Sequence, residues 1–137
     1  MTRFQHMAIT AITALTALAT VASATFVDQA DIEATEAVEV LSAIEIMVGD
    51  EAGTFRPNDN VTRAEMAKMV VVLVGETAEG ASLFTDCQDS WANGYIATAV
   101  EAGFVAGDGD STFRPQGTVT GLEAGKMLLA ALGYDSE

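Results

Sequence analysis

The chain has 137 residues, with 20 Asp and Glu against 6 Lys and Arg, so its formal charge is −14 at pH 7. This length allows one modest domain, and an apolar fraction of 50% is typical of a folded protein. The acidic balance argues against nucleic acid as a partner, because a basic face supplies most of that affinity, and against docking on anionic lipid. The single cysteine, Cys87, allows no internal disulfide. We interpret Cys87 as incidental, with a free reactive thiol as the alternative.

Residues 1–24 are predicted to be a secretory signal peptide. Arg3 provides the positive start, Met7 to Val21 carry no charge, and Ala22-Ser23-Ala24 forms an Ala-x-Ala cleavage site. The alternative is an uncleaved membrane anchor, but the apolar run is short for a span and is interrupted by threonines. We therefore expect an exported chain without stable membrane insertion.

The next segment is predicted to form a helix over 31–47, where apolar residues recur at three- and four-residue spacing. Gly49 ends this helix and begins a loop. A second helix is expected from Thr62 to about Val74, because Thr62 and Glu65 form a Thr-x-x-Glu capping box.

The loop between these two helices carries Phe55-Arg56-Pro57. Pro57 disfavours helical geometry at the preceding residue, which predicts extended backbone at Arg56. Phe55 is expected to fix the loop on the helices as a core residue. Arg56 is expected to tie the loop together rather than to bind a ligand.

This order of elements occurs twice, about 58 residues apart. Phe113-Arg114-Pro115 repeats the loop sequence, so Phe113 and Arg114 are expected to have the same roles as Phe55 and Arg56. Thr120-x-x-Glu123 repeats the capping box. A fixed period of this size indicates a repeat array. The apolar run 70–74 would suit a strand, but its counterpart 128–132 is rich in Leu and Ala, so both are predicted to be helical.

Residues 76–83 are small and polar and are predicted to be a linker. A helix is then expected to begin near Trp91-Ala92, capped by Asp89-Ser90. Its buried face is predicted to hold Tyr95, Ile96, Ala99, Val100 and Phe104. The fold class is therefore predicted to be all-α.

Taken together, four motifs of this chain resemble the S-layer homology (SLH) repeat. They are Phe-x-Asp, Trp-Ala, Gly-Asp-x-x-x-Thr-Phe-Arg-Pro and Val-Thr-Arg-Ala-Glu. The resemblance divides the chain into repeat 1 (26–75) and repeat 2 (84–134). It implies tandem helix-loop-helix repeats that pack as part of a pseudo-threefold bundle. The family commonly uses three repeats, so two could be the front of a longer anchor or could pair with a second copy.

The resemblance also implies a function. SLH repeats are non-covalent anchors that bind secondary cell-wall polysaccharide, often pyruvylated, in grooves between repeats, which places the protein at the cell wall or S-layer. Carried onto this sequence, the candidate ligand-binding residues are Arg63, Thr62, Glu65, Gly49, Asp50, Trp91, Gly107 and Asp108.

Arg63 is the strongest of these candidates, because a guanidinium at a helix N-terminus suits a carboxylate. The alternative is a surface arginine paired with a nearby glutamate. Trp91 could stack on a sugar or fill the core, and turn formation alone would explain the glycine and aspartate positions. Gly121 stands where repeat 1 has Arg63, which predicts one competent groove rather than two.

Three alternative functions are calcium binding, protein–protein assembly and catalysis. The segment Asp108-Gly-Asp110 resembles the start of an EF-hand, but Phe113 and Val119 occupy the positions that need Gly and Glu. A structural role in protein–protein assembly, without glycan, is the main alternative. Catalytic carboxylate pairs, nucleophile sets and phosphate loops do not stand out, so we expect neither an enzyme nor a cofactor.

Overall fold

The computed structural model describes residues 25–134, so the predicted signal peptide lies outside the described range. The described elements are a 3-10 turn η1 (Gln29–Asp31) and the helices α2 (Thr35–Ala43), α3 (Arg63–Leu73), α4 (Asn93–Glu101) and α5 (Gly121–Ala131). Within 25–134 the only β pairing is one isolated bridge between Thr62 and Thr118. The all-α prediction is confirmed. None of the described helices has the length and apolar character needed to cross a bilayer.

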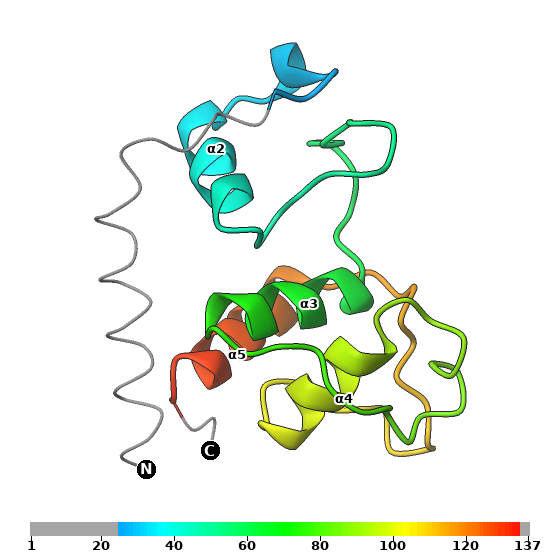
Figure 1. The fold of residues 1–137 in the computed structure, drawn as a ribbon. Helices are drawn as coiled ribbons and strands as arrows, with labels where there is room; N and C mark the ends of the chain where they lie inside the picture. The colour runs from blue at the N-terminus through cyan, green and yellow to red at the C-terminus, as the bar shows by residue number, and fades with distance from the viewer. Residues whose placement is uncertain (1–24, 135–137) are drawn as a thin grey trace.

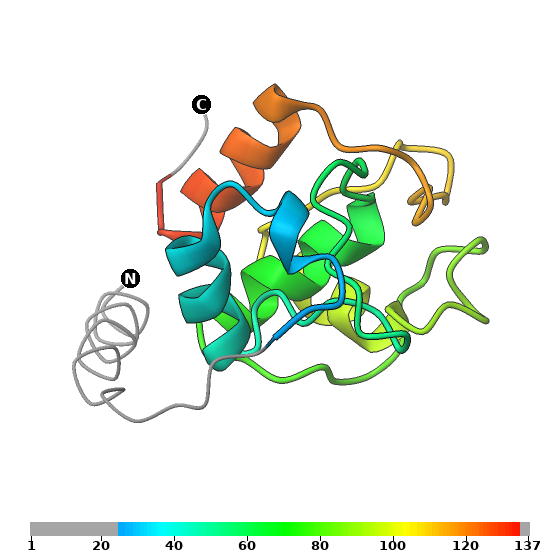
Figure 2. The same cartoon turned by 90° about the horizontal axis from the view of Figure 1, so that it is seen from above.

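The main core forms across the two repeats rather than within each of them. α3 comes from repeat 1, yet it lies between α4 and α5 of repeat 2 (Figures 1 and 2). α2 lies apart from this group, beside the repeat-1 loop (Figure 1). The largest fully buried side chains of the core are Phe113, Ile96, Val70, Val71 and Cys87.

A second, smaller cluster joins α2 to its own loop. Phe26, Ile32 and Val38 are buried together, and Phe55 packs against them. The rings of Phe26 and Phe55 lie 5.2 Å apart, and the matching rings of Phe84 and Phe113 lie 5.5 Å apart. The predicted core role is confirmed for Phe113, which is fully buried, while Phe55 is partly covered.

The first predicted helix is shorter than its sequence pattern suggested. The prediction of a helix over 31–47 was wrong at both ends, since α2 covers Thr35–Ala43. At its C-terminal end Glu45 adopts a left-handed conformation with φ 62°, and the N–H groups of Ile46 and Met47 both turn back to the carbonyl of Leu41. This reversal carries the chain into the loop before Gly49 is reached.

Both predicted capping boxes are present. Thr62 accepts from the N–H of Glu65 and Thr120 accepts from that of Glu123, while each glutamate side chain accepts from the N–H of its threonine. The start of α4 was predicted two residues too early. Its N-cap is Ala92, whose methyl group cannot accept a hydrogen bond. The Ser90 hydroxyl accepts from the N–H of Ala92 at 3.2 Å, in the turn before the helix.

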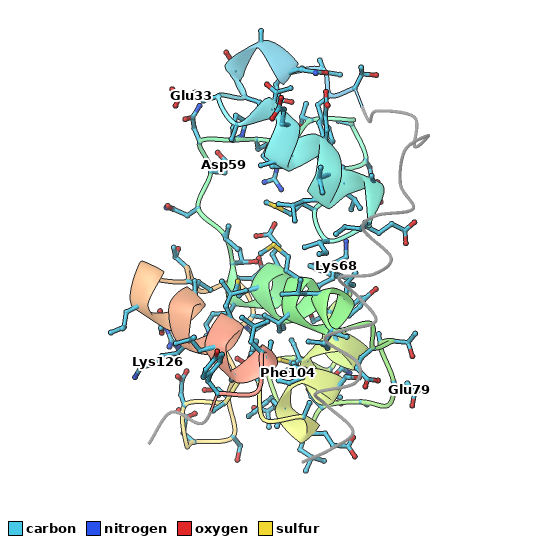
Figure 3. All side chains as sticks on the ribbon, turned by 90° about the vertical axis from the view of Figure 1, so that its left-hand side faces the viewer. Glu33, Asp59, Lys68, Glu79, Phe104 and Lys126 are labelled. Carbon is cyan, nitrogen blue, oxygen red and sulfur yellow. The ribbon has the colours of Figure 1, made fainter. Side chains whose placement is uncertain are left out.

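The buried face of α4 is close to the prediction. Ile96 and Ala99 are buried, and so is Phe104 just beyond the helix. Tyr95 is partly covered, whereas Val100 lies at the surface, one position beyond the face that meets α3. Figure 3 shows Phe104 directed into the group of α3, α4 and α5.

An aspartate clamps each loop. The carboxylate of Asp28 accepts from the N–H groups of Phe55 and Arg56 at 2.8 and 2.7 Å, and Asp86 does the same for Phe113 and Arg114. These clamps also set the backbone conformation at Arg56 and Arg114. Arg56 was predicted to be extended, but its φ is 59° and that of Arg114 is 57°, because both N–H groups of the pair must converge on one carboxylate.

Candidate functional site

Arg63 is the residue that joins the two repeats. Its Nε donates to the carbonyl oxygen of Phe113 at 2.7 Å, and its Nη2 donates to that of Ala106 at 2.7 Å. The guanidinium carbon lies 4.5 Å from the centre of the Phe113 ring, a cation–π geometry. Nη1 lies 3.8 Å from the carboxylate of Glu123. Every one of these partners belongs to repeat 2.

The backbone at the start of α3 docks on the same surface. The N–H groups of Arg63 and Ala64 donate to the carbonyls of Gly117 and Pro115 at 2.8 and 3.0 Å. The first N–H groups of a helix have no partner inside the helix, so the repeat-2 loop satisfies two of them. We call this acceptor surface the repeat-2 socket; it consists of Ala106, Phe113, Pro115, Gly117 and Glu123.

This placement bears directly on the expected role of Arg63. The residue is 4% exposed, so the alternative of a surface arginine is wrong, although the pairing with a glutamate is present. Direct contact between Arg63 and a glycan stays a prediction. Because the side chain is almost fully covered, such contact would require the covering part of repeat 2 to move.

Two further candidates, Thr62 and Glu65, serve the start of the same helix. One carboxylate oxygen of Glu65 accepts from the N–H and the hydroxyl of Thr62 at 2.7 and 2.9 Å. The other oxygen lies 3.6 Å from Nη2 of Arg56. The polar atoms of this pair are thus engaged in the cap and in holding the loop.

The candidate aspartates fold their own loops. Asp50 accepts from the N–H and the hydroxyl of Thr54, and these bonds hold the pKa of Asp50 below its usual value. Asp108 pairs with the Arg114 guanidinium, which lowers the pKa of this carboxyl. Arg114 therefore ties its loop together as predicted, and Arg56 does so through Asp50.

The candidate glycines allow close approach of the chain to itself. A Cβ on Gly49, which has a φ of 72°, would lie 2.7 Å from the carbonyl oxygen of Thr54. A Cβ on Gly107 would lie 2.8 Å from that of Thr112 and would also clash with the Phe84 ring. Turn formation accounts for both glycines without a ligand.

Trp91 lies at the surface. Its exposed fraction is 59%, so the alternative that it fills the core is wrong. The Tyr95 ring stands edge-on to the indole, with centroids 6.4 Å apart. The turn beneath is fixed, because Ala92 is fully buried and the Asn93 side chain accepts from the N–H of Ser82 at 2.8 Å. The molecule thus presents an aromatic pair on a rigid support.

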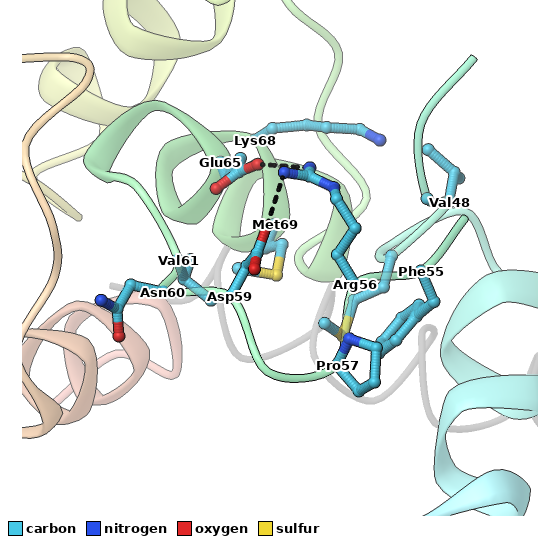
Figure 4. Close-up of a pocket in the computed structure, with 12 residues that line it drawn as sticks. Val48, Phe55, Arg56, Pro57, Asp59, Asn60, Val61, Glu65, Lys68 and Met69 are labelled. Atoms are coloured by element: carbon cyan, nitrogen blue, oxygen red, sulfur yellow. Dashed lines mark hydrogen bonds and ion pairs between the residues drawn. The ribbon is translucent and has the colours of Figure 1, made fainter. Parts of the chain in front are cut away.

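A pocket of about 180 Å³ opens in repeat 1, between its loop and α3 (Figure 4). The Arg56 guanidinium lies in it and pairs with Asp59 and Glu65. The Lys68 side chain runs past Arg56 toward Val48 and forms no ion pair with another described residue. Sequence reasoning missed this pocket, because its lining comes from a loop and a helix that no local pattern brings together.

Cys87 is fully buried, and burial together with the neighbouring Asp86 carboxylate raises the pKa of its thiol to about 11. A thiol in this state is a weak nucleophile near neutral pH. The reactive-thiol alternative therefore has no support in the geometry.

The S-layer homology domain profile matches residues 25–67 and 83–124, one match for each repeat. The chain belongs to the SLH domain family. Its repeats are related to those of large proteins. The middle cell wall protein of Brevibacillus brevis is 34% identical over 112 residues, which are 77% of this chain and 10% of that protein.

Two other relatives are matched over a larger share of their own length. The cellulosome-anchoring protein of Acetivibrio thermocellus is 31% identical over 105 residues, 72% of this chain and 24% of that protein. An uncharacterized cell wall amidase of Bacillus anthracis is 31% identical over 85 residues, 61% of this chain and 16% of that protein. This chain thus spans no more than a quarter of the length of these curated relatives.

The two SLH repeats of this chain are not equivalent at their junction surfaces. The repeat-1 pocket is lined by the counterparts of the repeat-2 socket, since Val48, Phe55, Pro57, Asp59 and Glu65 stand where repeat 2 has Ala106, Phe113, Pro115, Gly117 and Glu123. In repeat 2 the start of α3 fills this surface. In repeat 1 the same surface is open.

Proposed function

We propose that this chain is a non-covalent anchor that holds a surface protein on the cell wall by binding wall polysaccharide, and that Trp91 with Tyr95 forms the sugar-binding face. Membership of the SLH family and relatives named as cell-wall, surface-layer and anchoring proteins support a place at the cell surface. The proposal includes no catalytic step and no cofactor.

The exposure of Trp91 carries this proposal. An indole is a large apolar group, and leaving more than half of it in water forgoes the free energy that burial would supply. Tryptophan and tyrosine are enriched where binding energy concentrates, because a rigid ring offers much contact area with few rotamers to fix. The apolar C–H face of a sugar ring can cover the indole while its hydroxyls remain hydrated.

Arg63 contributes to this function as a positioning residue. It ties α3 to the repeat-2 loop, and α4, which follows Trp91, packs on α3. Loss of the guanidinium would therefore loosen the support of the aromatic pair. We further expect the bound polysaccharide to carry pyruvylated sugars, which are acidic.

Charge sets the strength expected of each contact. An acidic chain and an acidic polymer repel each other, but at physiological salt this repulsion is screened beyond about 8 Å. Short-range stacking then decides binding at each site. Affinity for one copy is expected to be modest, and many copies on one wall would hold firmly through multivalency.

The sole tryptophan provides a direct test. Because Trp91 is the only indole in the sequence, intrinsic fluorescence excited at the indole band reports on this site alone. Titration with purified wall polysaccharide is expected to quench or shift this emission in a saturable way. Polysaccharide that co-sediments with the protein while the emission stays unchanged would place the sugar elsewhere.

A matched pair of variants separates stacking from general surface effects. Trp91→Ala is expected to lower polysaccharide binding at least tenfold. Tyr134→Ala removes another exposed aromatic ring, remote in sequence from the pair, and is expected to bind as the wild type does. Equal losses in both variants would contradict a specific aromatic site.

A further inference from the structure

We propose that copies of this protein associate head to tail, with the start of α5 and its exposed leucines docked into the repeat-1 pocket of a second copy. The junction between repeats 1 and 2 provides the template for this contact. This contact does not depend on which glycan the protein binds.

The first observation is an apolar face on α5 that its counterpart α3 buries. Ala64 and Val71 are fully buried, yet the residues at the same repeat positions, Leu122 and Leu129, are 73% and 50% exposed. The same contrast continues along the helix. Val70 is fully buried and Val74 is partly buried, whereas their counterparts Leu128 and Leu132 are exposed.

The second observation is that the backbone donors of this face have no partner. The N–H groups of Arg63 and Ala64 bond to the repeat-2 loop, whereas the equivalent N–H groups of Gly121 and Leu122 bond to no acceptor within residues 25–134. Two donors at the start of a helix are thus available to another molecule.

The third observation is that the matching acceptors are also open. Pro115 and Gly117 accept from α3, but the carbonyls of their counterparts, Pro57 and Asp59, accept from no described residue. Both of these residues line the repeat-1 pocket. The open main-chain groups on the two surfaces therefore occupy the same repeat positions as the groups that form the junction already present in this molecule.

The side chains explain why the start of α5 fits this pocket in particular. In the repeat-2 socket Glu123 receives a cation from the incoming helix, which is Arg63. In the repeat-1 pocket Glu65 already has a cation from its own loop, Arg56, at 3.6 Å. An incoming arginine would meet that guanidinium, whereas Gly121 brings no side chain and leaves room for it.

One chain carries one copy of each half of this contact, so the natural occupant is a second copy. The contact is heterologous, and repeating it gives a closed ring or an open row of molecules. The charge of −14 on each copy opposes association, so screening by salt is expected to strengthen it.

Two single variants of the exported protein test this arrangement. Leu122→Glu spoils only the α5 side, and Val48→Glu spoils only the pocket; both residues are exposed, so the fold should tolerate the change. Leu83→Glu, at an exposed leucine of the linker, is the control. Molar mass is measured by sedimentation equilibrium over a range of protein concentrations.

The proposal predicts that wild type and Leu83→Glu gain mass with concentration, while each of the other two variants stays monomeric. An equimolar mixture of Leu122→Glu and Val48→Glu keeps one intact pocket and one intact α5 face. That mixture is expected to form heterodimers and nothing larger.

Other results would overturn the proposal. A wild type that is monomeric throughout, even in high salt, would show that the two surfaces do not meet. A mixture that stays monomeric would show that the α5 face and the pocket do not complement each other, and self-association of Val48→Glu alone would indicate pairing through α5 only. If the wild type is monomeric and Val48→Glu abolishes polysaccharide binding, the pocket would be a sugar site instead.

Discussion

Arg63 and Phe113, fifty residues apart, form a single contact in which the guanidinium donates to the backbone and also covers the ring. Nε lies 2.7 Å from the Phe113 carbonyl oxygen, and the guanidinium carbon lies 4.5 Å from the ring centre. Phe113 is fully buried, and Arg63, the residue expected to meet a ligand, holds repeat 2 against repeat 1 in this structure.

Arg63→Ala is therefore expected to destabilise the protein. The change leaves the carbonyls of Phe113 and Ala106 without their donors, and the total loss should be about 3 kcal/mol, since a buried unsatisfied group costs about 1–3 kcal/mol. Urea unfolding measures it. Lys68→Ala, further along the same helix, is the control and should change stability by less than about 0.5 kcal/mol. Equal stability of Arg63→Ala and wild type would contradict the junction role.

Local features of this fold could be read from the sequence, while features that depend on distant partners could not. The capping boxes at Thr62 and Thr120 involve residues three apart, and both are present. The left-handed backbone at Arg56 depends on Asp28, which lies 28 residues away, so Pro57 alone gave the wrong conformation.

The same limit applies to the candidate site. The sequence marked Arg63 as important, but its partners lie 43 and 50 residues away, and no local pattern indicates which loop it will meet. The exposure of Trp91 was equally open, because a tryptophan before a helix suits either a core or a surface.

Two glycine substitutions should move stability in opposite directions. Gly125 lies within α5 with nothing within 4 Å of an added Cβ, so Gly125→Ala should stabilise by about 1 kcal/mol through helix propensity. Gly107→Ala would force a Cβ to within 2.8 Å of the Thr112 oxygen and should destabilise the repeat-2 loop. Thermal unfolding of the two variants gives the comparison. Stabilisation by Gly107→Ala would show that the loop is not packed as described.

Stability is expected to fall in acid through the loop aspartates. Backbone hydrogen bonds from Phe55 and Arg56 hold the pKa of Asp28 below its usual 3.8, and bonds from Phe113 and Arg114 do so for Asp86 despite partial desolvation. A folded-state pKa below the unfolded value adds stability that is complete above about pH 4 and is lost as pH falls further.

The variants Asp28→Asn and Asp86→Asn test this directly. Each variant should have a lower free energy of unfolding at neutral pH, and this free energy should fall less steeply below pH 4 than in the wild type. Urea unfolding at a series of pH values measures both effects. Asp31→Asn, an exposed aspartate of η1 with no role in a clamp, is the control. If both clamp variants lose stability below pH 4 as steeply as the wild type does, other carboxylates cause the loss of stability in acid.

Cys87 is expected to resist modification in the folded protein. It is fully buried and its thiol pKa is raised to about 11, first by desolvation and then by the charge of Asp86. A thiol reagent at about pH 8 should react only as fast as the protein opens, and completely once denaturant is added. Rapid labelling of the native protein would contradict the burial of this position.

The anchoring claim is tested most directly by co-sedimentation of the exported protein with cell-wall sacculi, prepared with and without their secondary polysaccharide. We predict that wild type and Tyr134→Ala sediment only with sacculi that retain the polysaccharide, and that Trp91→Ala remains in solution. Sedimentation that needs neither the polysaccharide nor Trp91 would contradict glycan anchoring and favour a role in protein–protein assembly alone.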